Sequence, residues 1–478
     1  MVSDVEGEYT VDMLTFTINT DSKVSIYQQL YLFIKSEIEL GRITFDTKLP
    51  SKRKLSSYLK VSQNTIQTAY EQLIEEGYVV SKERKGFYVC KIDNIMKLHV
   101  QKEYNFIEQK KEHSVIEYDF SYHGVDMQTF PFTIWRRLYK EVINEYDKEL
   151  LQLGDTQGYY SLRSSISEYL HQSRGVNCSA SQIIVSSGTE FLLQTLIQLL
   201  DTDSIYGIEN PGYEKLNLLF SSNQAKFKAV NIDKSGMMLE EIVKSNANIL
   251  CITPAHQFPS GEIMPITRRV QILNWANETK DRYIIEDDYD SEFKYSGKPI
   301  PALQGLDSNG KVIYLGAFSK SLSPTIRVSY MVLPTHLMKK YLEKLSFIIC
   351  PVPIIEQKVL FRFIQEGYFG RHLNKMRNIY KKKREILLKN IMELNCGIEV
   401  FGADAGLHLL LGVNNTMTED QLVAAALLNG IKVYGLSKYY FDKNYVEKLP
   451  TILIGYAIMT ESEIIKAVKI LYKAWFYI

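Results

Sequence analysis

Five short apolar runs between residues 183 and 315 constrain the fold of this 478-residue chain. Segments with helical periodicity separate the runs. An alternation of short apolar strands and helices is typical of an α/β sheet with crossover helices. Such sheets bind ligands where their strands end, so the residues after each run are the candidates for function. The runs are 183–185, 204–208, 249–252, 283–285 and 312–315.

Two of these strand ends carry complementary charged groups. The last run leads into a turn of small residues that presents Lys320, and Arg327 follows seven positions later. The fourth run ends in acid at Asp287. A lysine that forms an imine, an arginine that holds a phosphate and a carboxylate that pairs with a ring nitrogen are the groups that pyridoxal 5'-phosphate (PLP) needs. The sequence therefore indicates a PLP site.

Two other strand ends offer groups that suit the same cofactor. Ser187, Gly188 and Thr189 follow the first run at the start of a predicted helix, where free backbone N–H groups bind phosphate. Tyr213 follows a Pro-Gly turn after the second run and is placed to stack on a flat ring. Helix caps, surface turns and solvated lysines are each common, so no single one of these features identifies a cofactor site. Their order at successive strand ends favours a cofactor site.

The first ninety residues have a different pattern. Residues 26–40 have the apolar periodicity of an amphipathic helix. Ser51 and Ser62 stand where the N-caps of two further helices are expected. Residues 78–80 and 86–89 are predicted to be two short strands around a basic turn. The module is therefore predicted to be a winged helix-turn-helix.

The third predicted helix begins with uncharged side chains that can pair with base edges in a major groove. The basic turn is placed to contact phosphates. Residues 23–92 carry twelve Lys or Arg against seven Asp or Glu, a modest excess that suits DNA. A three-helix unit can also be purely structural. Tyr27 on the first helix and Tyr58 on the second are expected on apolar faces.

The motifs of this module resemble those of the GntR family. They include Leu49-Pro-Ser-Lys-Arg53, Ser62-Gln-Asn-Thr65 and Gly86-Phe-Tyr-Val89. The family often has arginine where this chain has Gln63. The resemblance implies DNA contacts at Ser51, Lys52, Arg53, Ser62, Gln63, Asn64, Thr65, Gln67 and Lys85.

Composition excludes several other classes of protein. The apolar runs are too short for a membrane span and the N-terminus lacks the pattern of a signal peptide, so we expect a cytoplasmic protein. The cysteines have no C-x-x-C spacing, which favours reduced thiols over disulfides or a zinc site, and we expect no metal. They are Cys90, Cys178, Cys251, Cys350 and Cys396.

Three parts are expected along the chain. Residues 23–92 form the DNA-binding module, and residues 93–116 form a polar connector that is exposed and partly helical or packs on a domain. Residues 117–478 form the large domain, with a smaller subdomain from about residue 350.

Four motifs of the large domain resemble fold-type I aminotransferases and, more narrowly, the MocR subfamily of GntR regulators, including its GABA-responsive (GabR-like) members. They are Gly154-Asp-Thr-Gln-Gly158, Ser187-Gly-Thr-Glu190, His256-Gln-Phe-Pro259 and Glu286-Asp-Asp-Tyr289. The resemblance implies a multidomain protein: an N-terminal winged helix-turn-helix (α+β) followed by an α/β fold-type I PLP-dependent aminotransferase-like domain.

The same resemblance implies a role for each residue of the cofactor site. Lys320 carries the PLP imine, Asp287 pairs with the protonated ring nitrogen and Tyr289 approaches the ring hydroxyl. Tyr213 stacks on the ring, and Arg327 holds the phosphate together with Ser187, Gly188 and Thr189.

Three departures from the family pattern are visible. Ala317 replaces a Ser or Thr that binds phosphate in related enzymes, and Ser319 or Ser321 is expected to compensate. The asparagine beside the ring hydroxyl is replaced within 256–259, which hints at weak turnover. Two arginines expected to clamp the effector carboxylate appear as Lys215 and Lys438, which lack bidentate geometry but keep the charge.

We therefore expect a PLP-dependent regulator that binds a double-stranded DNA operator and senses an amine or amino acid effector, GABA-like, by forming an external aldimine at Lys320. The resemblance implies a head-to-tail homodimer in which the DNA module of one chain rests on the other. Two alternatives stay open. One is a working aminotransferase, and the other is a regulator of vitamin B6 synthesis that senses PLP itself.

Overall fold

The computed structural model describes residues 16–19, 22–92, 116–144, 148–295, 300–394, 397–441 and 449–476. These residues form two compact units, which divide between Lys110 and Lys111. Each unit has a hydrophobic core of its own. The predicted connector 93–116 lies outside the described residues, except for residue 116.

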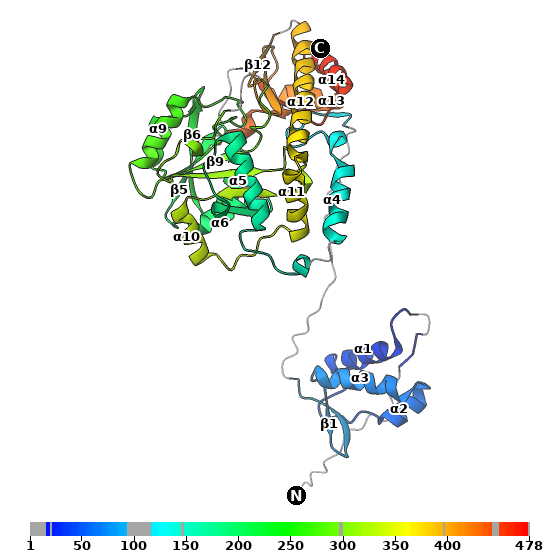
Figure 1. Ribbon diagram of the computed structural model, residues 1–478. Coiled ribbons are helices and arrows are strands. Elements are labelled where there is room, and N and C mark those ends of the chain that lie inside the picture. Colours follow the sequence, from blue (N-terminus) through cyan, green and yellow to red (C-terminus); the bar gives the residue numbers. More distant parts are fainter. Residues whose placement is uncertain are drawn as a thin grey trace. The chain divides into compact units, whose positions relative to one another are not determined.

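The small unit contains three helices followed by a two-stranded hairpin, in the order that the sequence predicts (Figure 1). The helices are α1 (Ile26–Glu39), α2 (Lys52–Leu59) and α3 (Gln63–Glu75). The hairpin pairs β1 (Val79–Lys82) with β2 (Gly86–Val89) in antiparallel register.

Local sequence explains where two of these helices begin. The hydroxyl oxygens of Ser51 and Ser62 each accept a hydrogen bond from the backbone N–H three residues later, at 3.2 and 3.1 Å. Each such cap stabilises its helix by about 1 kcal/mol. The prediction for Tyr27 and Tyr58 is wrong, because these side chains are 37% and 47% exposed while the other apolar residues fill the core. The core includes Leu30, Ile34, Leu55, Ile66, Ala69 and Leu73.

The large unit is built on an eight-stranded sheet with the order β4-β11-β10-β9-β8-β5-β6-β7. Its central strands run parallel, whereas β11 is antiparallel to both of its neighbours. The sequence predicts β4, β5, β8, β9 and β10 but not β6, β7 or β11. The strands are β4 (Ile183–Ser186), β5 (Ile205–Asn210), β6 (Lys226–Asp233), β7 (Gly236–Met237), β8 (Ile249–Ile252), β9 (Tyr283–Asp288), β10 (Val312–Ala317) and β11 (Ser329–Val332).

Helices cover both faces of this sheet (Figure 1). They are α4 (Phe132–Asn144), α5 (Tyr160–Arg174), α6 (Thr189–Leu199), α7 (Glu214–Ser222), α8 (Leu239–Ser245), α9 (Ile266–Asn277), α10 (Thr335–Lys344) and α11 (Ile354–Gln365). Successive strand residues point to opposite faces. Ile313 and Leu315 of β10 therefore pack with α6 and α10, whereas Tyr314 packs with α4, α5 and α11.

A smaller antiparallel sheet, in the order β12-β13-β16-β15, forms a second layer with long helices. The elements of this smaller subdomain are α12 (Tyr368–Glu393), β12 (Ile398–Phe401), β13 (His408–Val413), α13 (Glu419–Leu428), β14 (Ile431–Lys432), β15 (Tyr434–Gly435), β16 (Thr451–Gly455) and α14 (Glu461–Phe476). The short strand β3 (Tyr118–Asp119) pairs with β14, so the start of the large unit lies against this subdomain. Phe120 extends the contact by accepting a hydrogen bond from the Gly455 N–H.

Composition led to two expectations, one on membrane spans and one on cysteines, and the structure bears on both only for the described residues. None of their helices is long and apolar enough to cross a membrane. Four cysteines are free thiols, and Cys396 lies outside the described residues.

Candidate functional site

A cavity of about 370 Å³ lies where the strands of the large sheet end. It brings together most of the residues that the sequence predicts for PLP, although Ser187 and the predicted effector residue Lys438 are not among its lining residues. The predicted residues that line it are Gly188, Thr189, Tyr213, Lys215, Asp287, Tyr289, Ser319, Lys320 and Arg327.

Lys320 follows β10 and points its amine into this cavity. The Nζ atom donates a hydrogen bond to the backbone carbonyl of Tyr122. Burial lowers the pKa of Lys320 to about 8, against a smaller opposing effect of Asp290. A lowered pKa makes the neutral, nucleophilic amine available near physiological pH.

Asp287 lies within β9, beside Lys320 in the cavity lining. Burial, and then the neighbouring Asp288, raise the pKa of its carboxyl to about 7. Its Oδ1 atom is buried and has no hydrogen-bond partner among the described residues. A buried polar atom without a partner costs free energy, so this position is suited to a ligand that brings a donor.

A phosphate-sized corner lies where α6 begins. Arg327 Nη2 donates to the Ser187 carbonyl at 3.4 Å and to Glu190 Oε2 at 3.0 Å. Gly188 has a φ of +96°, and a Cβ atom there would lie 2.1 Å from Arg327 Nη2. Only glycine leaves room for the guanidinium beside the N-terminus of the helix, a position that favours anions.

Aromatic side chains form the walls of the cavity. The Tyr213 ring lies edge-on to Phe258 with centroids 5.8 Å apart. The Tyr289 hydroxyl oxygen lies 2.9 Å from His256 Nδ1. Flat, apolar walls of this kind suit an aromatic ligand.

The two predicted effector lysines lie on the same side of the site. Lys438 Nζ sits 4.6 Å from the Tyr434 ring centroid and 5.9 Å from that of Tyr122, which lines the cavity. Burial lowers the pKa of Lys438. His123 also lines the cavity, and burial followed by Lys320, Lys215 and Lys438 lowers its pKa to about 4. This part of the cavity therefore favours anions.

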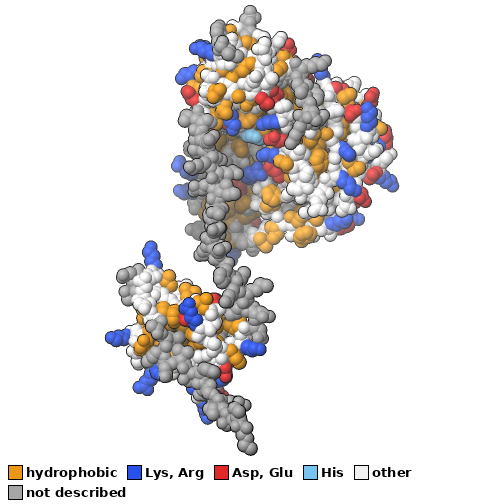
Figure 2. All heavy atoms as spheres, turned by 180° about the vertical axis from the view of Figure 1, so that it is seen from behind, with side chains coloured by type: hydrophobic (Ala, Val, Ile, Leu, Met, Phe, Trp, Pro, Cys, Tyr) orange, Lys and Arg blue, Asp and Glu red, His pale blue; other side chains and the backbone are white. Residues whose placement is uncertain are grey.

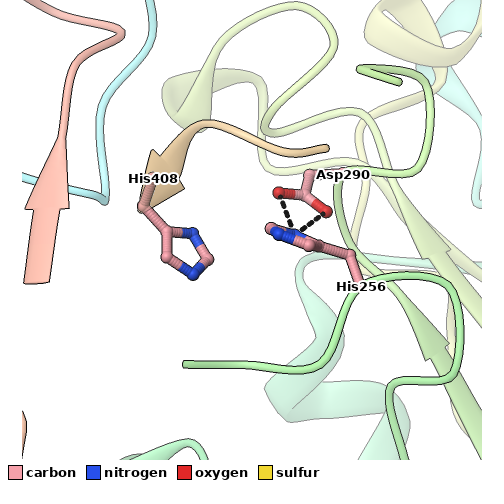
Figure 3. A group of neighbouring side chains, drawn as sticks. All are labelled: His256, Asp290 and His408. Atoms are coloured by element: carbon pink, nitrogen blue, oxygen red, sulfur yellow. Dashed lines mark hydrogen bonds and ion pairs between the residues drawn. The ribbon is translucent and has the colours of Figure 1, made fainter. Parts of the chain in front are cut away.

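The sequence did not identify several residues that the fold brings to the cavity. Tyr122 and His123 arrive from the segment between β3 and α4, and His408 arrives from β13 of the smaller sheet. Asp290 also lines the cavity, and His256 lies next to Asp290 and His408 without being a lining residue itself (Figure 3). No motif spacing marks Tyr122 or His408, because only the tertiary fold places them here.

A larger cavity of about 850 Å³ lies between β5, β6 and the smaller sheet. Asn210, Asn231, Phe401 and Thr451 are among its lining residues. None of the predicted cofactor or effector residues lines it, so size alone does not mark the functional site.

The small unit carries its predicted DNA contacts mostly on its surface. Arg53, Gln63, Asn64, Gln67 and Lys85 are exposed. The two capping serines accept backbone hydrogen bonds, and the hydroxyl of the half-buried Thr65 lies 2.8 Å from that of the second serine. Lys52 Nζ donates to Gln67 Oε1 at 3.3 Å. Basic side chains predominate over acidic ones on the face of the small unit drawn in Figure 2.

Comparisons with known proteins agree with both units. The family "Aminotransferase class I and II" matches residues 125–471, and the family "Bacterial regulatory proteins, gntR family" matches residues 26–89. The chain is 30% identical over 439 residues to the probable rhizopine catabolism regulatory protein MocR of Rhizobium meliloti, covering 89% of each chain. The chain belongs to the MocR-type subfamily of GntR regulators. It is also 39% identical over 463 residues to the HTH-type transcriptional regulator YdeL of Bacillus subtilis, covering 97% of this chain and 99% of the relative.

Solved structures agree with the fold of the large unit. Kynurenine aminotransferase from Pyrococcus horikoshii superposes with a TM-score of 0.67 at 24% identity, over 76% of this chain and 90% of that one. The predicted fold class is therefore confirmed for this MocR-type chain. It is a transcriptional regulator with a large domain of the aminotransferase class I and II family, and members of that family bind PLP.

The residues of this MocR-type chain fit that cofactor. The unpartnered Asp287 Oδ1 calls for a donor such as a protonated ring nitrogen. The Gly188 turn and Arg327 form a cradle for an anion that a Cβ atom would fill. Lys320 presents an amine of lowered pKa between them.

Proposed function

We propose that the protein is a PLP-dependent transcriptional regulator that senses an amine or amino acid through Lys320. The observation that carries the proposal is the single cavity that holds both Lys320 and the unpartnered, buried carboxyl of Asp287. Two groups with pKa values shifted by burial in one cavity are typical of a functional site. Membership of a regulator family supports sensing rather than metabolism as the main role.

The residues of the cavity divide the binding of the cofactor among them. When bound, PLP supplies an aldehyde that condenses with amines and a ring that withdraws electrons. Lys320 would hold the aldehyde carbon, and Asp287 would accept a hydrogen bond from the ring nitrogen. Arg327 and the N–H groups at the start of α6 would hold the phosphate, and Tyr213 would pack against the ring.

An effector amine would displace the Lys320 nitrogen and leave the lysine as a free amine in the cavity. Lys215 and Lys438 supply positive charge for an effector carboxylate, and after burial and Lys320 the same two lysines lower the pKa of His123. The effector changes DNA binding only if two arrangements of the protein differ in their affinity for it.

The proposal includes a homodimer that binds repeated DNA half-sites. Leu151 and Leu153, which precede α5, are 93% and 80% exposed, and Phe347 is 75% exposed. Large apolar side chains left this open are suited to burial against a second copy of the chain. Light scattering of the purified protein tests this point, and a monomeric mass at micromolar concentration would contradict it.

The decisive experiment is a spectroscopic titration of the PLP-loaded protein with a panel of amines and amino acids. An effector is expected to shift the visible absorbance band and then to change affinity for operator DNA. Borohydride reduction before addition of effector is expected to fix the cofactor on Lys320, as read by peptide mass mapping. Holoprotein without a visible band, or an adduct on another lysine, would end the proposal.

Two other functions have specific support. The lowered pKa of Lys320 also suits a proton shuttle in transamination, and solved aminotransferases share the fold. Steady turnover of an amino donor with a keto acid, without sequence-selective DNA binding, would select that function. The chain is also 29% identical over 429 residues to the pyridoxine biosynthesis regulator PdxR of Corynebacterium glutamicum. A full DNA response to PLP alone would select PLP sensing.

A further inference from the structure

A buried histidine, His256, and a buried carboxylate, Asp290, lie side by side and have no role assigned so far (Figure 3). His256 follows β8 and Asp290 follows β9, and each side chain is 1% exposed. The His256 Nδ1 atom lies 3.0 and 3.1 Å from the two Asp290 oxygens. The Tyr289 hydroxyl oxygen lies 2.9 Å from the same nitrogen. Three oxygen atoms therefore share one ring nitrogen.

The number of protons decides how these atoms bond. A ring nitrogen carries either one proton or one lone pair, and an ionised carboxylate can only accept. Hydrogen bonding to Asp290 therefore requires the proton on His256 Nδ1. With that proton in place, the Tyr289 O–H cannot donate to His256, and its own proton points elsewhere. Burial, followed by Asp290 and Asp287, raises the pKa of Tyr289 well above its usual value, so the hydroxyl keeps its proton.

We propose that the Asp290–His256 pair is a positioning device that fixes the Tyr289 hydroxyl as a hydrogen-bond donor into the cavity, toward an oxygen of the bound cofactor ring. The inference rests on the proposed PLP site. Tyr289 lines the cavity together with Lys320, whereas His256 does not. His256 therefore acts through the tyrosine and has no direct access to a ligand.

The smaller sheet holds the pair in place. Gly406, just before β13, has a φ of +71°, and a Cβ atom there would lie 2.0 Å from His256 Cε1 and 2.6 Å from Asp290 Oδ2. The hydroxyls of Tyr295 and Tyr456 donate to the Gly406 carbonyl at 2.8 and 2.7 Å, which fixes that backbone. Only glycine at this position leaves room for the histidine ring and the carboxylate.

The opposite side of the histidine ring supports the same tautomer. His256 Nε2 is buried without a hydrogen-bond partner among the described residues. The neighbouring His408 ring lies 4.9 Å away between centroids, and burial lowers its pKa well below the usual value, so it offers His256 no charge to pair with. A buried N–H donor without a partner costs free energy, so a proton is better placed on Nδ1, where Asp290 accepts it, than on the unpartnered Nε2.

Two histidines and a carboxylate with ligand atoms within 4.8 Å of one another are also suited to a divalent cation. A cation would compete with the hydrogen bonds that already join His256 to Asp290. The geometry therefore favours the hydrogen-bonded pair, and metal binding is a separate outcome of the test.

The test is a pH titration of the visible band of the holoprotein without effector. A hydrogen bond donated to an oxygen on the cofactor ring withdraws electron density from the ring. It thereby lowers the proton affinity of Lys320 Nζ, the nitrogen through which the cofactor would be held. Tyr289→Phe is therefore expected to raise the midpoint by about one pH unit, a tenfold change in proton affinity. Asp290→Asn frees the histidine to take its proton on Nε2 and to accept from Tyr289, so it is expected to shift the midpoint in the same direction. His256→Gln should do likewise.

Double variants separate positioning from a general structural effect. His256→Gln is expected to add no further shift in the Tyr289→Phe background, because the donor is already absent and His256 does not line the cavity. The matched control is His336→Gln, which removes a histidine that bonds Tyr283 at 3.0 Å at the far end of β9. It is expected to leave the midpoint unchanged. Unshifted midpoints in Asp290→Asn and His256→Gln, or an additive shift in the double variant, would overturn the proposal.

A direct measurement on the unmodified protein covers the case in which a variant fails to fold. Histidine-selective ¹⁵N NMR reports which ring nitrogen carries the proton. A proton on His256 Nδ1 supports the proposal, and one on Nε2 alone overturns it, as does stoichiometric metal in the purified holoprotein. A wild-type protein without any visible band would instead refute the PLP site, and the NMR measurement would still decide the tautomer.

Discussion

Asp287 and Lys320 face one cavity from neighbouring parallel strands, and burial moves their pKa values toward each other. The carboxyl rises to about 7 and the amine falls to about 8. Asp287 lies opposite Leu315 in the β9–β10 register, five residues before the lysine. Burying the charged form of either group therefore costs free energy. A ligand would relieve that cost if it brought a hydrogen-bond donor for the Asp287 carboxyl and a carbonyl for the Lys320 amine.

The first prediction concerns the stability of the apoprotein. The folded pKa of Asp287 is raised from 3.8, so its contribution to stability is greatest below about pH 4 and is lost as pH rises through about 7. Asp287→Asn is therefore expected to increase the free energy of unfolding of the apoprotein at pH 8 by about 1–3 kcal/mol. Urea denaturation at pH 5 and pH 8 measures this.

The same variant should lose its cofactor. PLP is expected to bind Asp287→Asn at least about tenfold more weakly, since a neutral amide oxygen can accept a hydrogen bond from a protonated ring nitrogen but forms no ion pair with it. A variant that is less stable at pH 8 and binds PLP normally would contradict the role assigned to this carboxyl.

The second prediction concerns the pH dependence of PLP capture. Burial lowers the pKa of Lys320 from 10.5 to about 8, so the neutral amine becomes the major form above that pH. The rate at which apoprotein captures PLP is expected to rise roughly tenfold between pH 7 and pH 9 and then to level off. Stopped-flow absorbance measures the rate, with Lys320→Arg as the inactive control. A rate still rising steeply at pH 10 would show that the amine is not the buried one.

The sequence predicted those features of the fold that depend on local chemistry. The caps at Ser51 and Ser62 require only the adjoining helix, and the strand that ends at Asp287 is a short apolar run followed by acid. Strands β6 and β11 were not predicted, because β6 is mostly exposed with Val230 as its one buried residue and β11 follows the lysine turn without a clear break. Tyr58 was misplaced because helical spacing does not reveal which apolar residue the neighbouring helix covers.

The candidate site was predictable only where its residues follow strand ends. Lys320, Asp287 and Tyr213 belong to this group and line one cavity. Tyr122 and His408 come from distant segments that meet the sheet only after the smaller subdomain packs against it. The pairing of Arg327 with Glu190 likewise depends on a contact across 137 positions of sequence.

The third prediction tests the phosphate corner. A Cβ atom on Gly188 would collide with the Arg327 guanidinium, and the residue has a left-handed backbone. Gly188→Ala is expected to weaken PLP binding by about ten- to a hundredfold, because the arginine must move and the turn is strained. Gly154→Ala is a suitable control, since its Cβ would meet nothing within 4 Å. Equal affinities for the two variants would refute the assignment.

The fourth prediction concerns effector charge. Lys438→Gln is expected to weaken binding of a carboxylate-bearing effector about tenfold while leaving affinity for a simple amine unchanged. Lys432→Gln is the matched control, because this half-buried lysine has its Nζ atom 5.4 Å from the centroid of the same Tyr434 ring and pairs with Asp119 instead. Spectroscopic titration with paired amines and amino acids measures both. An equal loss for amine and amino acid would mean that Lys438 supports the fold and not the effector.

The last prediction concerns DNA. Arg53 is exposed at the start of α2, and Asn64 is exposed on the first turn of α3. Arg53→Ala is expected to lower affinity for all sequences by about tenfold and to reduce the salt dependence by about one phosphate contact. Asn64→Ala should instead relax preference for operator over unrelated DNA, by about 1–3 kcal/mol of discrimination, because an amide reads base edges. The control is Arg42→Ala, which removes an exposed arginine paired with Glu37 beyond the end of α1. Fluorescence anisotropy at several salt concentrations measures all three variants, and a loss for Arg42→Ala equal to that for Arg53→Ala would place the DNA surface elsewhere.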